Sequence, residues 1–228
     1  MPVLSLPVLS TNVVPVIKGN AKLSKGVHRI VGFGLPADTD YTDPTTGEVR
    51  NTCEAALACR GVCYAKQGRY LFSNVANARR KALAAVLDKA FVSNMVMTLG
   101  GFGNTYDTVR VHDSGDFLSE QNLRDWYSVA RKLPHLTFYA YTKRMDLTLF
   151  KRKPRNFRII QSYGGKHDSL IDPTKPHSRI FATREDMERA GYVDGNTSDD
   201  PAIEGVIKIG LVYHGVKKLT DGQKKFFR

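Results

Sequence analysis

The chain has 228 residues, of which 42% are hydrophobic and 25% charged, and this balance fits one globular domain spanning residues 1–228. It has no apolar run of about 18 residues, which excludes a membrane-spanning helix, and no membrane partner is expected. The formal net charge of +12 indicates either a polyanionic partner, such as DNA or RNA, or only a well-solvated basic surface.

The first third of the chain contains few regular elements. Residues 1–27 are apolar but include three prolines and no basic leader, so they predict an extended arm or an edge strand rather than a secretory signal. A short strand is expected near residues 28–35, followed by a loop rich in Asp, Thr, Pro and Gly. Apolar residues at the helical period then predict one long helix from about Ser73 to Leu99, ended by two glycines.

The remainder alternates between strands and helices. Strands are expected at 108–113, 136–142, 157–163, 178–183 and 205–215. Ser119 and Thr183 are expected to cap helices, a short helix is expected at about 146–152, and a polar loop is expected at 195–201. Strict alternation predicts the α/β class, with a parallel sheet of about five or six β/α units curled into a partial barrel.

The cysteines are confined to one short segment. Cys53, Cys59 and Cys63 are the only three in the chain and are spaced C-x5-C-x3-C within a loop at about 53–70. Grouped thiolates suit a [4Fe–4S] cluster, which three cysteines can hold while one iron stays open, or a zinc ion with a fourth ligand from elsewhere. Absence of any metal is the third alternative. Grouped free thiols also predict a reducing, cytoplasmic compartment.

Polar side chains follow the predicted strands, at the edge where parallel α/β sheets usually bind ligands. Asp113, Ser114 and Asp116 follow one strand and Lys143 follows the next, so they are candidate cofactor-binding residues. The plainer alternative is that the acids cap turns and the lysine is solvated. His112 and His214 lie near strand ends and are either a fourth metal ligand or ordinary packed histidines.

Basic residues gather in the segment that follows the strand expected at 136–142. If a nucleic acid binds, this segment and the basic C-terminal tail are the first candidates to contact its phosphates. The candidate nucleic-acid-binding residues are Lys143, Arg144, Lys151, Arg152, Lys153 and Arg155.

Three motifs in this order and spacing resemble the phage "gene product 88" family: CYAKQGRY after two upstream cysteines, VRVHDSGDF, and FYAYTKR. The resemblance implies a distant relationship to radical S-adenosylmethionine proteins and a radical-SAM-like partial barrel. It implies a [4Fe–4S] cluster on Cys53, Cys59 and Cys63 at the barrel mouth. It also implies that Asp113, Ser114 and Asp116 lie near the methionine end of S-adenosylmethionine, although radical enzymes mostly space their cysteines C-x3-C-x2-C.

Three functions remain open from the sequence. The first is a phage-type iron–sulfur protein that acts on or with nucleic acid without being an enzyme. The second is a radical-SAM-like enzyme that modifies a nucleotide or nucleic acid, with S-adenosylmethionine as a candidate cofactor. The third is a zinc-stabilised factor that binds a host protein in the host cytoplasm.

Overall fold

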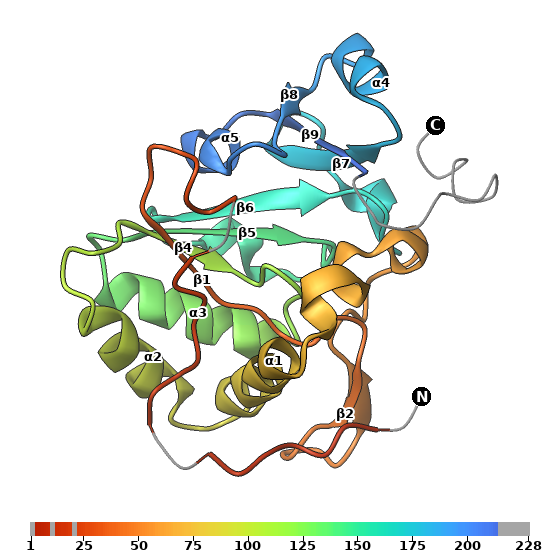
Figure 1. The fold of residues 1–228 in the computed structure, drawn as a ribbon. Coiled ribbons are helices and arrows are strands. Elements are labelled where there is room, and N and C mark those ends of the chain that lie inside the picture. The colour runs from red at the N-terminus through yellow and green to blue at the C-terminus, as the bar shows by residue number, and fades with distance from the viewer. Residues whose placement is uncertain (1–2, 10–11, 20–21, 214–228) are drawn as a thin grey trace.

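The computed structural model describes residues 3–9, 12–19 and 22–213, and its centre is a curled half-barrel sheet of seven parallel strands (Figure 1). The expected α/β class and partial barrel are therefore confirmed. The strands lie in the order β1-β4-β5-β6-β7-β9-β8, so the first five follow the chain and β9 lies between β7 and β8. Their bounds are Ile30–Gly32, Thr108–Val111, Thr137–Thr142, Phe157–Ser162, His177–Phe181, Lys208–Val212 and Val193–Asp194 in that order.

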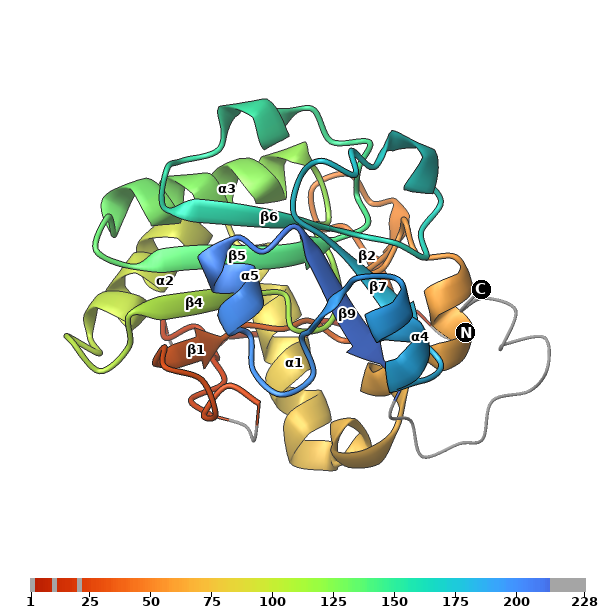
Figure 2. The same ribbon diagram turned by 90° about the horizontal axis from the view of Figure 1, so that it is seen from above.

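Helices cover the two faces of the sheet unequally. α1 (Ser73–Val86), α2 (Phe91–Gly100) and α3 (Glu120–Lys132) pack on one face, and the short α5 (Asp200–Glu204) lies on the other (Figures 1 and 2). The larger apolar core lies beneath the three long helices and contains the fully buried Trp126. The concave face is filled by a smaller cluster around Tyr139 and Ile203. The half-barrel is therefore a packed structure rather than an open cup.

The prediction of one helix from Ser73 to Leu99 is wrong, because the helix breaks between Val86 and Phe91. The Asp88 carboxylate accepts a hydrogen bond from the Ala90 amide at 2.7 Å, and this side chain competes with the helical pattern. The apolar periodicity continued across the break because both helices bury their apolar faces in the same core.

Other element boundaries differ less. The caps are confirmed, because Ser119 Oγ accepts from the Asn122 amide and Thr183 Oγ1 from the Asp186 amide, the latter starting α4 (Arg184–Arg189). The helix expected near 146–152 is the 3₁₀ turn η4 (Leu149–Arg152), and the expected polar loop at 195–201 already starts α5. The last strand ends at Val212, and the predictions for His214 and the basic tail lie outside the described residues.

The described part of the N-terminal segment lies along the body of the protein and forms two isolated bridges with it. Leu4 forms a parallel bridge with Tyr41, and Ile17 forms an antiparallel bridge with Gly32. Tyr41 belongs to a small hairpin that the loop prediction missed, β2 (Asp40–Thr42) with β3 (Val49–Asn51). Val14 is almost fully buried, so this segment completes the core.

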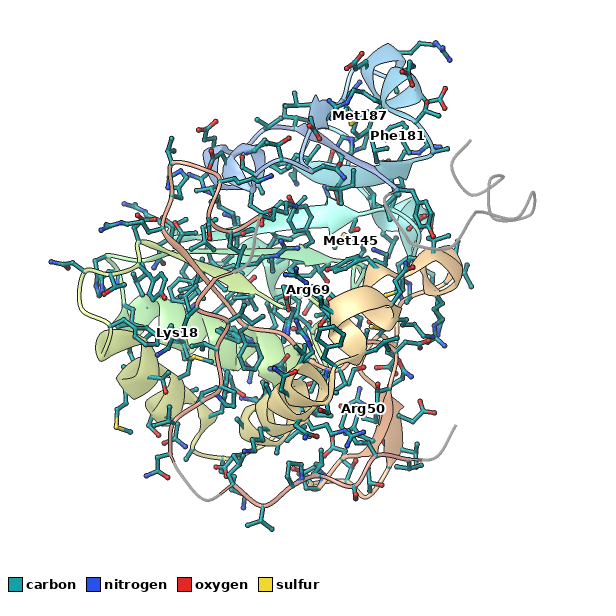
Figure 3. The ribbon with its side chains drawn as sticks, viewed as in Figure 1. Lys18, Arg50, Arg69, Met145, Phe181 and Met187 are labelled. Carbon is teal, nitrogen blue, oxygen red and sulfur yellow. The ribbon has the colours of Figure 1, made fainter. Side chains whose placement is uncertain are left out.

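The last strands of the sheet and α4 form one end of the molecule. Phe181 of β7 and Met187 of α4 are buried near each other there (Figure 3). A Cβ at Gly210 would approach the Met187 sulfur to 2.4 Å, so a glycine in β9 lets α4 pack closely on the sheet. Across the described residues, no helix combines the length and apolar character needed to cross a bilayer.

Candidate functional site

The three cysteines lie on a loop at the carboxyl edge of the sheet. The loop is a succession of 3₁₀ turns, η1 (Ala58–Val62), η2 (Tyr64–Lys66) and η3 (Gly68–Leu71), at the side toward which the strand arrows point (Figure 1). The Gly164 carbonyl, just after β6, accepts from the Leu57 amide at 3.2 Å and from the Cys59 amide at 3.4 Å. These bonds anchor the loop to the sheet edge that binds ligands in such folds.

Gly165 sets how closely this loop approaches the sheet. A Cβ there would lie 2.9 Å from Lys143 Cβ and 3.0 Å from the Ala55 carbonyl oxygen. We expect Gly165→Ala to lower the free energy of unfolding by about 1–3 kcal/mol, because backbone atoms must move. Urea unfolding measures this cost.

The matched control is Gly100→Ala at the end of α2, where a Cβ would meet nothing within 4 Å. That variant should be as stable as the parent or slightly more so, because alanine favours the helix. Equal effects of the two substitutions would contradict the tight contact at Gly165.

A buried aspartate holds the loop from the other side. The Asp38 amide donates to Cys53 Sγ at 3.3 Å. The Asp38 carboxylate pairs with Lys66 at 2.7 Å and with Arg60 at 3.3 Å, and both cations come from the cysteine loop. Asp38 has a φ of 46°, in the left-handed region that non-glycine residues rarely adopt. The loop is therefore wrapped around one acid, which the sequence did not reveal.

The thiols are half-buried and influence one another electrostatically. Burial, together with the negative charges of Asp116, Cys63 and Cys59, raises the pKa of Cys53 to about 12, although the hydrogen bond from the Asp38 amide lowers it. Burial and the charge of Cys59 also raise the pKa of Cys63, which Lys66 and Lys143 counteract. Thiolates here would need a positive counter-charge, which a bound metal supplies.

The donor chemistry fits a soft metal, but the described residues contain no group of three or more Cys, His, Asp or Glu side chains already arranged around one ion. Three thiols on one loop are the ligands that iron–sulfur clusters and zinc prefer. The residues therefore fit in kind, and metal binding would require the thiols to converge further.

Asp113 and Ser114 are engaged by an arginine from α1. Arg79 forms two bonds to the Asp113 carboxylate, at 2.7 and 3.0 Å, and one to Ser114 Oγ at 2.7 Å. The Tyr70 ring, from the cysteine loop, stacks on the guanidinium at 4.6 Å, and the Tyr64 hydroxyl donates to the Asp113 carbonyl. The pair of residues therefore joins α1, the end of β4 and the cysteine loop.

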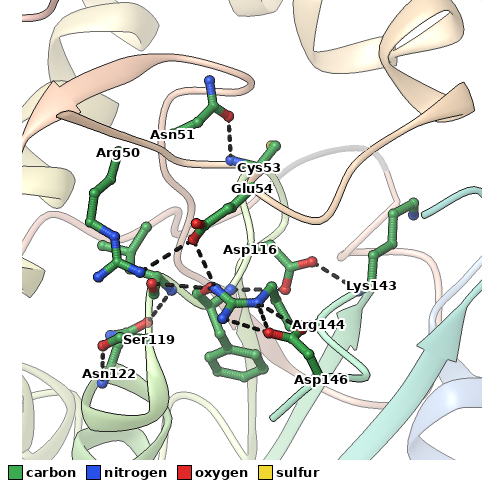
Figure 4. Close-up of polar contacts among 12 residues, drawn as sticks. Arg50, Asn51, Cys53, Glu54, Asp116, Ser119, Asn122, Lys143, Arg144 and Asp146 are labelled. Atoms are coloured by element: carbon green, nitrogen blue, oxygen red, sulfur yellow. Dashed lines mark hydrogen bonds and ion pairs between the residues drawn. The ribbon is translucent and has the colours of Figure 1, made fainter. Parts of the chain in front are cut away.

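Asp116 and Lys143 come together beneath the loop (Figure 4). The Asp116 carboxylate accepts from the Lys143 amide at 2.8 Å and from Thr142 Oγ1 at 2.6 Å. Burial raises the pKa of Asp116 in spite of these bonds. The Lys143 ammonium turns toward Ser162 Oγ at 2.7 Å. The ends of β4, β5 and β6 thus meet at one point next to the cysteine loop.

The basic segment divides into one buried arginine and several exposed side chains. Arg144 is 7% exposed and forms hydrogen bonds to Asp146, to Glu54 and to the Phe117 carbonyl (Figure 4). It is thus a structural cation beneath the surface, which leaves it no free face for a phosphate. The exposed members of the candidate set are Lys151, Arg152, Lys153 and Arg155.

His112 lies in the core, 4% exposed, with its ring edge-on to Phe33, Phe117 and Trp126. Burial lowers its pKa to about 3, so it is neutral. Of the two alternatives for this residue, the packed histidine is the one observed.

Sequence reasoning missed Asp38 and Arg79 because each acts through a partner far away in the chain.

Fold and site together define a parallel α/β half-barrel protein with a three-cysteine loop at the carboxyl edge of its sheet. The chain belongs to the gene product 88 family, whose model matches residues 14–224. The family resemblance of the sequence motifs is therefore confirmed. No curated protein and no solved structure matches the chain.

Proposed function

We propose that this protein binds a [4Fe–4S] cluster through Cys53, Cys59 and Cys63 at the mouth of the half-barrel and acts on or with nucleic acid. The observation that carries the proposal is the position of the loop. All the cysteines of the chain lie on one segment, held by Asp38 on one side and by Gly164 on the other. That segment lies next to the ends of three adjacent strands.

Iron–sulfur binding is favoured over zinc by the donor count. A structural zinc ion takes four protein ligands, whereas a cubane cluster can use three thiolates. His112, the nearest histidine in sequence to the strand-end acids, is committed to the core. Arg60 and Lys66 on the loop, with Lys143 next to it, would offset the negative charge of a thiolate-bound cluster.

We expect the full chain, reconstituted anaerobically with ferrous iron and sulfide, to turn brown and to hold about four irons per chain. Each single Cys→Ser variant at 53, 59 or 63 should lose most of this iron and the visible absorbance, because no other thiol exists in the chain. Iron and sulfide analysis with visible spectroscopy measures both effects.

The control is Ser93→Ala, which removes an exposed hydroxyl on α2 outside the candidate site and should leave iron loading unchanged. If aerobically purified protein contains about one zinc per chain and added iron does not displace it, the zinc alternative is supported instead. Iron retained by the variant lacking all three cysteines would contradict the proposed ligands.

A radical-SAM-like activity is the second candidate, and the placement of Asp116 and Lys143 favours it. Asp116 acts electrostatically on Cys53 and Lys143 acts on Cys63, so an amino acid ligand bound between them could contact an ammonium and a carboxylate. Asp113 and Ser114 contribute less, since Arg79 occupies them. Equilibrium dialysis of S-adenosylmethionine against the reconstituted protein and its Lys143→Met variant tests this candidate, and absence of binding to the parent would remove it.

A further inference from the structure

A groove of about 1230 Å³ runs along β6, and its described lining includes no residue of the cysteine loop. It lies between α3 and the 145–153 segment on one side and the 170–176 segment and α5 on the other. Small-molecule pockets usually measure about 300–1,000 Å³, so this groove has room for an extended ligand.

The groove exists because the sheet opens between two strands. β6 runs from Phe157 to Ser162, but β7 pairs with it only at Gln161 and Ser162. β7 begins only at His177, opposite Gln161, so residues 157–160 of β6 have no strand partner on that side among the described residues. Arg158 and Ile159, on opposite faces of β6, both reach the groove through this opening.

The walls of the groove are strongly cationic. Two acids also line it, but each already has a cationic partner, Asp146 with Arg144 at 2.9 Å and Asp172 with Lys175 at 3.1 Å. A surface with this balance attracts a chain of negative charges. The lining cations are Arg124, Lys151, Arg152, Lys153, Arg158 and Lys175, of which Lys175 is the one that also pairs with Asp172.

Apolar groups form part of the floor. Leu147, Phe150 and Ile159 line the groove, and the ring of Phe150 is only partly buried. Exposed base faces stack or pack on such groups, whereas a duplex hides the faces of its bases within the stack. We propose that this groove binds a single strand of nucleic acid, with its phosphates on the cationic walls and its bases on the apolar floor.

A strand held here would lead to the cysteine loop, and its role there rests on the proposed function. Gln161 lines the groove, while the next residue, Ser162, holds the Lys143 ammonium beneath the loop. Met145 and Asp146 line the groove two and three residues after Lys143. The groove and the candidate site are therefore joined through adjacent residues of β6 and of the segment after β5.

The test measures fluorescence anisotropy of the full chain with labelled oligo(dT) and oligo(U) of about twelve nucleotides, within the range that such surfaces cover. For six phosphate contacts we expect log K to fall with log salt with a slope of about −4, at roughly 0.7 per contact. The variant Lys151→Gln/Arg158→Gln/Lys175→Gln should bind at least about tenfold more weakly at low salt, with a slope nearer −2.

The matched control is Arg80→Gln/Lys81→Gln/Lys89→Gln, which removes three exposed cations around α1 and gives the same net charge. It should keep the slope and most of the affinity of the parent. Preference for DNA over RNA, or the reverse, identifies the source of the strand and supports the groove in either case. Equal losses in the two variants, tighter binding of a duplex of the same length, or no binding by the parent would overturn the proposal.

The outcome of the strand-binding experiment can be separated from the outcome of the iron-loading experiment. Strand binding by metal-free protein would support the groove even if no cluster forms. Cluster formation without strand binding would remove the groove and leave the metal proposal standing. Circular dichroism and urea unfolding of both triple variants check that neither one has lost its fold.

Discussion

Asp199→Asn is expected to lower the free energy of unfolding by about 3–5 kcal/mol, because it leaves buried cations without their counter-charge. Asp199 is 1% exposed and accepts from Arg110 at 2.6 Å and from the Tyr139 hydroxyl at 2.8 Å. Lys22 pairs with its other oxygen at 2.8 Å. The carboxylate thereby ties the N-terminal segment and α5 to β4 and β5. Urea unfolding at neutral pH measures the loss.

Glu204→Gln is the matched control, since it removes an exposed carboxylate from the same helix. Its effect should stay within about 0.5 kcal/mol. A similar small effect of Asp199→Asn would mean that the buried cluster does not hold the concave face together.

The same residue predicts a dependence on pH. Burial disfavours the charged carboxylate, yet the charges of Arg110 and Lys22 hold the pKa of Asp199 below its ordinary value. A folded-state pKa below the unfolded value of about 3.9 stabilises the protein above that pH, and the contribution is lost as the pH falls through the folded value. The stability difference between parent and Asp199→Asn should therefore shrink below about pH 4. A difference that grows on acidification would contradict the assignment.

Arg79→Met is the second large effect, also expected to cost about 3–5 kcal/mol, because it leaves the Asp113 carboxylate buried without its partner. Asp113 is 3% exposed, and Arg79 supplies it with two hydrogen bonds. The variant should also loosen the cysteine loop, because Tyr70 stacks on the lost guanidinium. Urea unfolding measures the first effect, and faster alkylation of Cys63 in the folded protein measures the second.

Arg80→Met is the control at the adjacent position of α1, where the side chain is exposed. It should change stability by no more than about 0.5 kcal/mol and leave thiol alkylation unchanged. Comparable losses from the two substitutions would show that helix propensity rather than the ion pair is responsible.

Local signals explain which parts of the fold were predictable. Strands such as Thr137–Thr142 and caps such as Ser119 depend on residues close together in sequence, so their patterns are legible. The break in the helix after Val86 could not be read from the sequence, because the apolar period continues through both helices. A single side-chain hydrogen bond at Asp88 accompanies the interruption of the helical backbone pattern. The hairpin at Asp40–Asn51 was missed because its strands are too short to show alternation.

For the candidate site the division is similar. The grouping of Cys53, Cys59 and Cys63, and the meeting of Asp116 with Lys143, followed from spacing and from the rule that parallel strands end at one edge. The sequence could not tell that Arg144 is buried while Lys151 is exposed, because both lie in one basic run.

By itself, then, the sequence determined the order of β/α units, the confinement of all thiols to one loop and the excess of positive charge. Only the tertiary structure decided which charges are internal. Arg79 with Asp113 and Arg110 with Asp199 join residues 34 and 89 positions apart. Whether a charge is buried with a partner or free to contact a ligand depends on contacts between residues far apart in the sequence, which no local sequence pattern reveals.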